Sequence, residues 1–261
     1  MKKLLVALFL MLVFTVKSAI SADMSFVQVD GIRFSPETEA QTENLKSIVD
    51  KINKEHDIDF VVFTGNNISK PDAEYLKSFF KIAKKLDKPF YVALGNKDVN
   101  KRKGLGKDLY MNLARKKVFN MKRIKTPSYY FEKNGVLFVI ADGSKEVIPL
   151  QSGYYRPEVI SWLDSLLTKK KNKNVIIIQH FPIIPPAEKE NYYTFKADEY
   201  LKMINNHKNV KAVISGHFNV NNEIEKNGIR HISTAEAPTY RVIEIIDYDT
   251  DRPEIWSTLK E

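Results

Sequence analysis

Five short apolar stretches in this chain each stop abruptly at glycine and polar residues. They occupy residues 26–33, 60–66, 92–98, 175–182 and 212–219. Uninterrupted apolar runs are typical of strands that are covered on both faces, as in an α/β sheet. In such a sheet, ligand chemistry collects just beyond the carboxyl ends of the strands. The sequence therefore predicts that five strand ends converge on one site.

Helical patterns alternate with the strands in the first half of the chain. Strands are predicted at residues 25–30, 60–65 and 89–95. One helix is predicted to open at Ser35 and Pro36, and a second near Ser69 with Pro71 in its first turn. The helical spacing is carried by Leu45, Ile48, Val49 and Ile52, and then by Leu76, Phe79, Phe80 and Ala83. This order predicts a parallel sheet with right-handed crossovers.

The second half adds antiparallel pairing. A hairpin is predicted at residues 129–132 and 136–141 around Asn134 and Gly135, and a second hairpin turn at Asn227 and Gly228. Further strands are predicted at 175–179, 210–215, 229–233, 241–247 and 254–259, with helices at 109–117, 156–168 and 197–206. No internal repeat or linker interrupts the pattern, so residues 23–261 are predicted to form one domain.

The N-terminus has the features of a signal peptide. Lys2 and Lys3 precede an uncharged apolar run over residues 4–16, and small residues follow up to Ala22. Residues 1–22 are therefore predicted to be removed, which indicates a secreted or periplasmic protein; an uncleaved N-terminal anchor is the alternative. The chain has no cysteine, which excludes disulfides and thiolate metal ligands.

Positive charge is concentrated in one segment. Residues 97–125 hold eleven Lys or Arg side chains against Asp98 and Asp108, a local charge of +9 in a chain whose formal net charge is +9. Such a segment raises the local concentration of anionic ligands, including nucleic acid and anionic lipid. A solvated lysine-rich loop that keeps the protein soluble is the alternative interpretation.

The motifs at the strand ends resemble those of the calcineurin-like metallophosphoesterase superfamily. They are a glycine followed by a polar residue at Gly65 and Gly95, His180 before Phe-Pro, and His217 after glycine. The resemblance runs over residues 26–259. It implies an α/β fold, a four-layer α/β/β/α sandwich of two mixed sheets flanked by helices. It also implies a two-metal centre that clamps a phosphate while a bridging hydroxide attacks it.

The sequence departs from the superfamily at several ligand positions. Gly31 and Arg33 stand where the family has its opening Asp and His, and Asn66 stands in place of the bridging Asp. Lys97 replaces the phosphate-facing His, and Asn219 replaces the last His of the final motif. The ligands particular to the first metal are therefore missing.

The positions of the second metal are retained. Asn96, His180 and His217 match its ligands, and with Asn66 they offer imidazole and amide donors without a carboxylate. Such a set holds one divalent ion (Mn, Zn or Fe) only weakly, or none. Strand alternation directs Asp30 to the opposite face, whereas a bulge at Gly31 would bring it into the site.

Arg33 and Lys97 suggest a different chemistry, because both donate hydrogen bonds to phosphate and carry fixed positive charge. The leading hypothesis is a pocket that binds a phosphorylated small molecule or polymer through Arg33, Lys97 and Asn219 with little or no hydrolysis. The alternative is a phosphomonoesterase or phosphodiesterase with one residual metal, in which Arg33 and Lys97 stabilise developing charge. A third hypothesis is nucleic-acid or anionic-lipid binding through residues 97–125.

Overall fold

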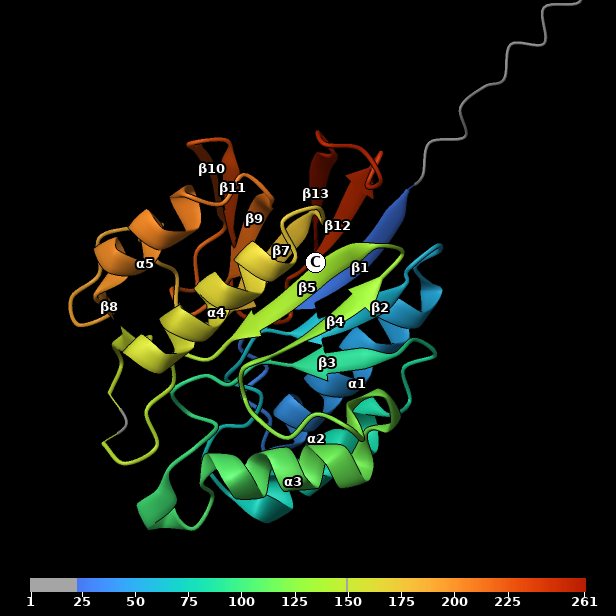
Figure 1. The fold of residues 1–261 in the computed structure, drawn as a ribbon. Helices are drawn as coiled ribbons and strands as arrows, with labels where there is room; N and C mark the ends of the chain where they lie inside the picture. Colours follow the sequence, from blue (N-terminus) through green and yellow to red (C-terminus); the bar gives the residue numbers. More distant parts are fainter. Residues whose placement is uncertain (1–22, 149) are drawn as a thin grey trace, which may run out of the picture.

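Two β-sheets pack face to face and carry helices on their outer faces (Figure 1). The computed structural model describes residues 23–148 and 150–261. The first sheet has the order β13 (Glu254–Lys260), β12 (Tyr240–Ile246), β1 (Met24–Val29), β2 (Phe60–Phe63), β3 (Phe90–Val92). The second has the order β10 (Asn222–Lys226), β11 (Ile229–Ser233), β9 (Val210–Ser215), β7 (Val175–Gln179), β5 (Val136–Ala141), β4 (Tyr129–Lys133). A short parallel pair joins β6 (Gly153–Tyr154) to β8 (Thr194–Phe195).

The helices complete the four layers that the sequence predicted. Helices α1 (Glu39–Lys54), α2 (Ala73–Ala83) and α3 (Lys107–Lys117) cover the first sheet, and α4 (Pro157–Lys169) and α5 (Ala197–Asn205) cover the second. Two 3₁₀ turns flank α3, namely η1 (Lys101–Lys103) and η2 (Phe119–Met121). The prediction of a four-layer α/β/β/α sandwich is confirmed.

Side-chain alternation along the central strands explains the layering. In β5, Phe138 and Ile140 belong to the core between the two sheets, whereas Leu137 and Val139 pack in the cluster beneath α4 and α5. Both faces are thus buried, which is why this strand is apolar at every position. Phe60 of β2 crosses the gap between sheets, with its ring centroid 4.8 Å from that of Phe138.

The strand ends meet at one edge because β1, β2 and β3 run parallel, as do β5, β7, β9 and β11. Backbone hydrogen bonds continue past the strands into the loops. Gly31 N donates to Gly65 O at 3.1 Å, and Gly216 N donates to His180 O at 3.1 Å. The five predicted stretches are therefore neighbours at a single edge that spans both sheets.

Several predicted boundaries are wrong for local reasons. Helix α1 begins at Glu39, later than the predicted start at Ser35. Helix α2 begins at Ala73, because the Asp72 side chain accepts hydrogen bonds from the first free N–H groups and Pro71 lies outside it. The predicted strand 89–95 is shorter, Phe90–Val92, since the chain turns into the site after it. Strands β6 and β8 were not predicted and have two residues each. The predicted hairpin turn at Asn227 and Gly228 is confirmed, and it joins β11 to the polar edge strand β10, for which no bounds were predicted.

Residues 1–22, the predicted signal peptide, lie outside the described residues. Within residues 23–148 and 150–261, no helix combines the length and the apolar character needed to cross a bilayer.

A pH-dependent stability is expected from His231 in β11. Burial, with a smaller contribution from Lys226, lowers the pKa of His231 from 6.5 to about 4. The unfolded state then binds more protons between these values, so stability from this group is complete above pH 6.5 and is lost as pH falls toward 4. We expect the unfolding free energy to fall by about 1–2 kcal/mol between roughly pH 6.5 and 5 through this group. Urea titrations of the native protein and His231→Leu should differ in pH slope over this range; equal slopes would contradict the assignment.

Candidate functional site

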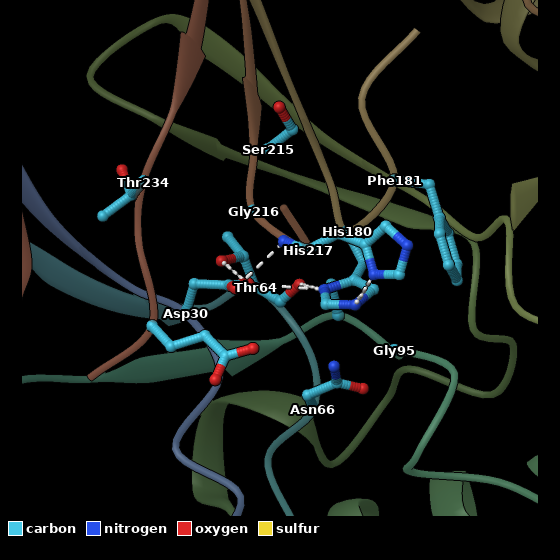
Figure 2. Close-up of polar contacts among 12 residues, drawn as sticks. Asp30, Thr64, Asn66, Gly95, His180, Phe181, Ser215, Gly216, His217 and Thr234 are labelled. Atoms are coloured by element: carbon cyan, nitrogen blue, oxygen red, sulfur yellow. Dashed lines mark hydrogen bonds and ion pairs between the residues drawn. The ribbon is translucent and has the colours of Figure 1, made fainter. Parts of the chain in front are cut away.

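Two buried histidines form the centre of the strand-end cluster (Figure 2). His180 follows β7, and its Nδ1 lies 2.9 Å from the carbonyl oxygen of Thr64. A carbonyl only accepts hydrogen bonds, so His180 Nδ1 carries a proton and donates a hydrogen bond to Thr64. His217 follows β9, and its Nδ1 lies 3.1 Å from His180 Nε2. The structure thus brings together the two histidines that the sequence singled out.

Asp30 faces these histidines from the end of β1. Its carboxylate accepts hydrogen bonds from Thr64 Oγ1 at 2.9 Å and from the backbone N–H of His217 at 3.0 Å, and one oxygen lies 3.3 Å from His180 Nδ1. Gly31, in the left-handed conformation at φ +58°, follows it. Asp30 is therefore turned into the cluster, the option that alternation disfavoured. It lies on the Nδ1 side of His180 and holds that ring in place.

The two asparagines of the motif differ in what their side chains contact. Asn66 Oδ1 accepts a hydrogen bond from the backbone N–H of Lys97 at 3.0 Å. Asn96 Nδ2 donates to Gln151 Oε1 at 2.7 Å, while Asn96 Oδ1 is buried and has no partner in the described chain. An amide oxygen in this state is available to a ligand. Asn96 thus keeps a free donor atom, whereas the oxygen of Asn66 is already used by the turn.

Glu236, a residue that the sequence motifs did not indicate, joins Gly31, Arg33 and Asn219, the three positions that the resemblance assigns to a first metal. Arg33 forms an ion pair with Glu236. Asn219 Oδ1 accepts a hydrogen bond from the backbone N–H of Glu236 at 3.0 Å. A Cβ atom at Gly31 would lie 2.4 Å from Glu236 Cγ, so the glycine makes room for this side chain. Burial raises the pKa of Glu236, and the charge of Arg33 opposes that rise.

Lys97 and Asp98 have separate roles in the central motif. The half-buried Lys97 side chain forms no hydrogen bond or ion pair with any residue in 23–148 or 150–261. Asp98 is fully buried and accepts hydrogen bonds from Gly95 N at 2.8 Å, Ile68 N at 3.1 Å and Asn67 Nδ2 at 3.2 Å. Burial raises the pKa of Asp98 to about 6, and the hydrogen bonds from these donors oppose the rise. Asp98 fixes the loop, and Lys97 is left free to contact a ligand.

Tyr192 covers His217. The two rings stack with centroids 4.7 Å apart, and Lys189 Nζ lies 3.9 Å from the centroid of the Tyr192 ring. Burial lowers the pKa of His217 to about 2, assisted by the charges of His180, Lys189 and Arg33. His217 is therefore a neutral imidazole at ordinary pH, the state that binds metals.

The two histidine nitrogens have the spacing of two ligands of a single divalent ion. Two imidazole nitrogens at roughly 2.0–2.1 Å from one zinc ion lie about 3–3.4 Å apart. His180 Nε2 and His217 Nδ1 are 3.1 Å apart, and the buried Asn96 Oδ1 has no partner. Within the described ranges, no group of three or more His, Cys, Asp or Glu side chains is placed to hold a metal. All available donors are neutral, because the Asp30 carboxylate is committed to Thr64 and to the His217 backbone.

Comparison with solved structures supports the architecture. A dimetal phosphatase from Danio rerio superposes with a TM-score of 0.64 at 16% identity, covering 90% of this chain and 98% of that one. Protein TT1561 of Thermus thermophilus superposes with a TM-score of 0.59 at 14% identity, covering 89% of this chain and 98% of that one. At such low sequence identity, these two comparisons show a shared fold and nothing about function.

Sequence comparison gives the family. A curated relative from Arcobacter nitrofigilis, a probable glycerophosphodiester phosphodiesterase, is 31% identical over 132 residues. That match covers 48% of this chain and 42% of the relative, so it spans less than half of either protein. The sequence model of the calcineurin-like phosphoesterases matches residues 19–221, which is more than half of the chain. The chain therefore belongs to the calcineurin-like phosphoesterase family.

Proposed function

We propose that this protein binds a phosphorylated small molecule or polymer at the strand-end site, with little or no hydrolysis. The observation that carries the proposal is the charge at this edge. Lys97 has no acidic partner among the described residues, and Arg33 and Lys189 both act electrostatically on His217. Among the described residues, Arg33 is paired with Glu236. Lysine and arginine side chains in this setting are suited to a phosphate.

The proposal of little or no hydrolysis rests on the ligand positions. A two-metal phosphoesterase needs carboxylates that hold both ions and offset their charge. Here Arg33 pairs with Glu236, Asn219 accepts a hydrogen bond from the Glu236 backbone, and Gly31 leaves room for its side chain. Asn66 Oδ1 accepts a hydrogen bond from the Lys97 backbone. The charge that a first metal would supply comes instead from fixed side-chain cations.

Binding of inorganic phosphate and of a glycerophosphodiester, measured by calorimetry, tests the proposal. Lys97→Gln and Arg33→Gln are each expected to weaken binding about tenfold, since each removes a charge-assisted hydrogen bond. Glu236→Gln is expected to strengthen binding several-fold, because it frees the Arg33 guanidinium and removes a negative charge. Lys171→Gln, an exposed lysine in the turn after α4, is the matched control. Unchanged binding by an Arg33→Gln, Lys97→Gln double variant would contradict the proposal.

A second function is favoured by the 3.1 Å approach of His180 Nε2 to His217 Nδ1. These atoms would hold one divalent ion, such as Mn²⁺, Zn²⁺ or Fe²⁺, and that ion would polarise a phosphoryl oxygen. Lys97 would then stabilise developing charge in a phosphodiesterase, the class of the partial relative from Arcobacter nitrofigilis. Metal-dependent turnover that disappears in His180→Ala and His217→Ala would replace the binding proposal with this one.

We also propose that residues 1–22 are a signal peptide, that residues 23–261 form the phosphoesterase domain, and that the protein is secreted or periplasmic. The charged start, apolar run and small residues of the first 22 positions support this proposal. N-terminal sequencing of the exported protein tests it, with cleavage expected near Ala22.

A further inference from the structure

The loop that follows β5 exposes a group of large apolar side chains. Val147, Ile148 and Leu150 are 52%, 62% and 50% exposed, and on or beside β8 Tyr193 and Phe195 are 48% and 42% exposed. The short β6–β8 pair brings these segments together, because Gly153 N donates to Tyr193 O at 3.1 Å. We call these five side chains the apolar patch. Lys145 Nζ, in the same loop, lies 4.9 Å from the centroid of the Phe195 ring, so the loop and β8 are neighbours. Neighbouring exposed apolar side chains mark interaction surfaces.

Cations border the apolar patch without acidic partners. The 3₁₀ turn η1 places Lys101, Arg102 and Lys103 at the surface, and none of them forms an ion pair within the described ranges. Lys101 N donates to Glu146 O at 2.7 Å, which ties this turn to the loop. The Glu146 carboxylate accepts from the backbone N–H of Lys107 at 2.7 Å and so faces the start of α3. The border is therefore positively charged.

The same loop reaches the candidate site. Two residues after Gln151, which accepts the hydrogen bond of Asn96 Nδ2, the chain enters β6. In Figure 1 the loop lies on the same side of the molecule as η1 and β8, away from the edge strands β10 and β13. A surface that covers the apolar patch would therefore lie next to the strand-end site.

We propose that the apolar patch and η1 dock this protein on an anionic membrane surface. Val147, Ile148 and Leu150 enter the interfacial region while Lys101, Arg102 and Lys103 contact lipid phosphates. Inserted apolar side chains alone, or a basic cluster alone, bind a membrane weakly, whereas the two together bind it stably. Charge complementarity selects an anionic bilayer as the occupant.

Vesicle co-sedimentation tests this docking. The protein is expected to bind vesicles of equal parts phosphatidylglycerol and phosphatidylcholine, to bind pure phosphatidylcholine at least tenfold more weakly, and to dissociate as salt is raised. Ile148→Ser is expected to weaken binding about tenfold through lost apolar burial. The Lys101→Glu, Arg102→Glu double variant is expected to weaken it at least tenfold. Ile224→Ser, an exposed isoleucine on the edge strand β10, is the matched control.

The outcomes separate docking from ligand binding. Arg33→Gln is expected to sediment with vesicles as the native protein does while losing phosphate affinity, and Ile148→Ser is expected to do the reverse. Docking is overturned if the native protein ignores anionic vesicles, or if Ile148→Ser and Ile224→Ser bind them equally. It is also overturned if the patch is covered by a second copy, seen as a dimer that Ile148→Ser dissociates. Binding of an oligonucleotide more tightly than of vesicles, without dependence on Ile148, would favour the nucleic-acid prediction for residues 97–125 instead.

Discussion

Gly216→Ala is expected to lower the free energy of unfolding by about 3 kcal/mol or more and to disorganise the histidine pair. A Cβ atom at this position would lie 1.9 Å from Asp30 Oδ1 and 2.0 Å from Asp30 Cγ. Asp30 is completely buried and held by Thr64 and the His217 backbone, so it has no free direction in which to move. The new methyl group must therefore break these hydrogen bonds or displace the β9 loop.

Urea titration of Gly216→Ala and Asp30→Ala, singly and combined, measures this effect. The combined variant is expected to be more stable than the sum of the two losses predicts, because removal of the carboxylate makes room for the methyl group. Gly104→Ala is the control, since its Cβ atom would meet nothing within 4 Å and only its φ of +91° opposes the change. Additive losses, or a Gly216→Ala variant as stable as Gly104→Ala, would show that the contact is unimportant.

Much of the fold follows from local sequence patterns. The apolar runs predict the central strands because those strands are buried on both faces, and Asn134-Gly135 predicts the β4–β5 hairpin. Helix starts were harder to place, since the side chain of Asp72 decides where α2 begins. The short strands β6 and β8 have no pattern of their own, because two residues cannot show a period.

The site was predictable only where its residues lie in the strand-end motifs. His180 and His217 were indicated in this way and lie together, with their nearest ring nitrogens 3.1 Å apart. Glu236 was missed because it follows β11 and reaches positions 31, 33 and 219 through tertiary packing alone. The direction of Asp30 was also open, since strand alternation ends where Gly31 adopts a positive φ.

Residues 31, 33 and 219, which the family resemblance assigns to a first metal, act as one unit. A side chain larger than glycine at position 31 meets Glu236 Cγ, and Glu236 is held in turn by Arg33 and by Asn219. A single reversion at position 31, 33 or 219 therefore leaves the other two contacts in place. Recovery of a family-like first-metal position would require replacement of Glu236 as well.

Asp98→Asn is expected to destabilise the protein by about 3 kcal/mol and to loosen the loop that carries Asn96 and Lys97. The Asp98 carboxylate accepts three hydrogen bonds, one oxygen from Ile68 N and the other from Gly95 N and Asn67 Nδ2. An asparagine has one acceptor oxygen, so in either orientation its NH₂ group would point at an N–H donor. At least one buried donor then loses its partner, and water cannot replace that partner because Asp98 is completely buried.

Asp72→Asn is the matched control for this change. Asp72 also accepts two hydrogen bonds, from the backbone N–H groups of Glu74 and Tyr75. It caps α2 at the surface, however, where asparagine is an equally good cap. The control is expected to change stability by less than roughly 0.5 kcal/mol. Urea titration measures both variants, and amide hydrogen exchange at Gly95 and Ile68 reports whether the loop has opened. Equal stability of the two variants would mean that the buried carboxylate does not organise the central motif, and the positions of Lys97 and Asn96 would then need another explanation.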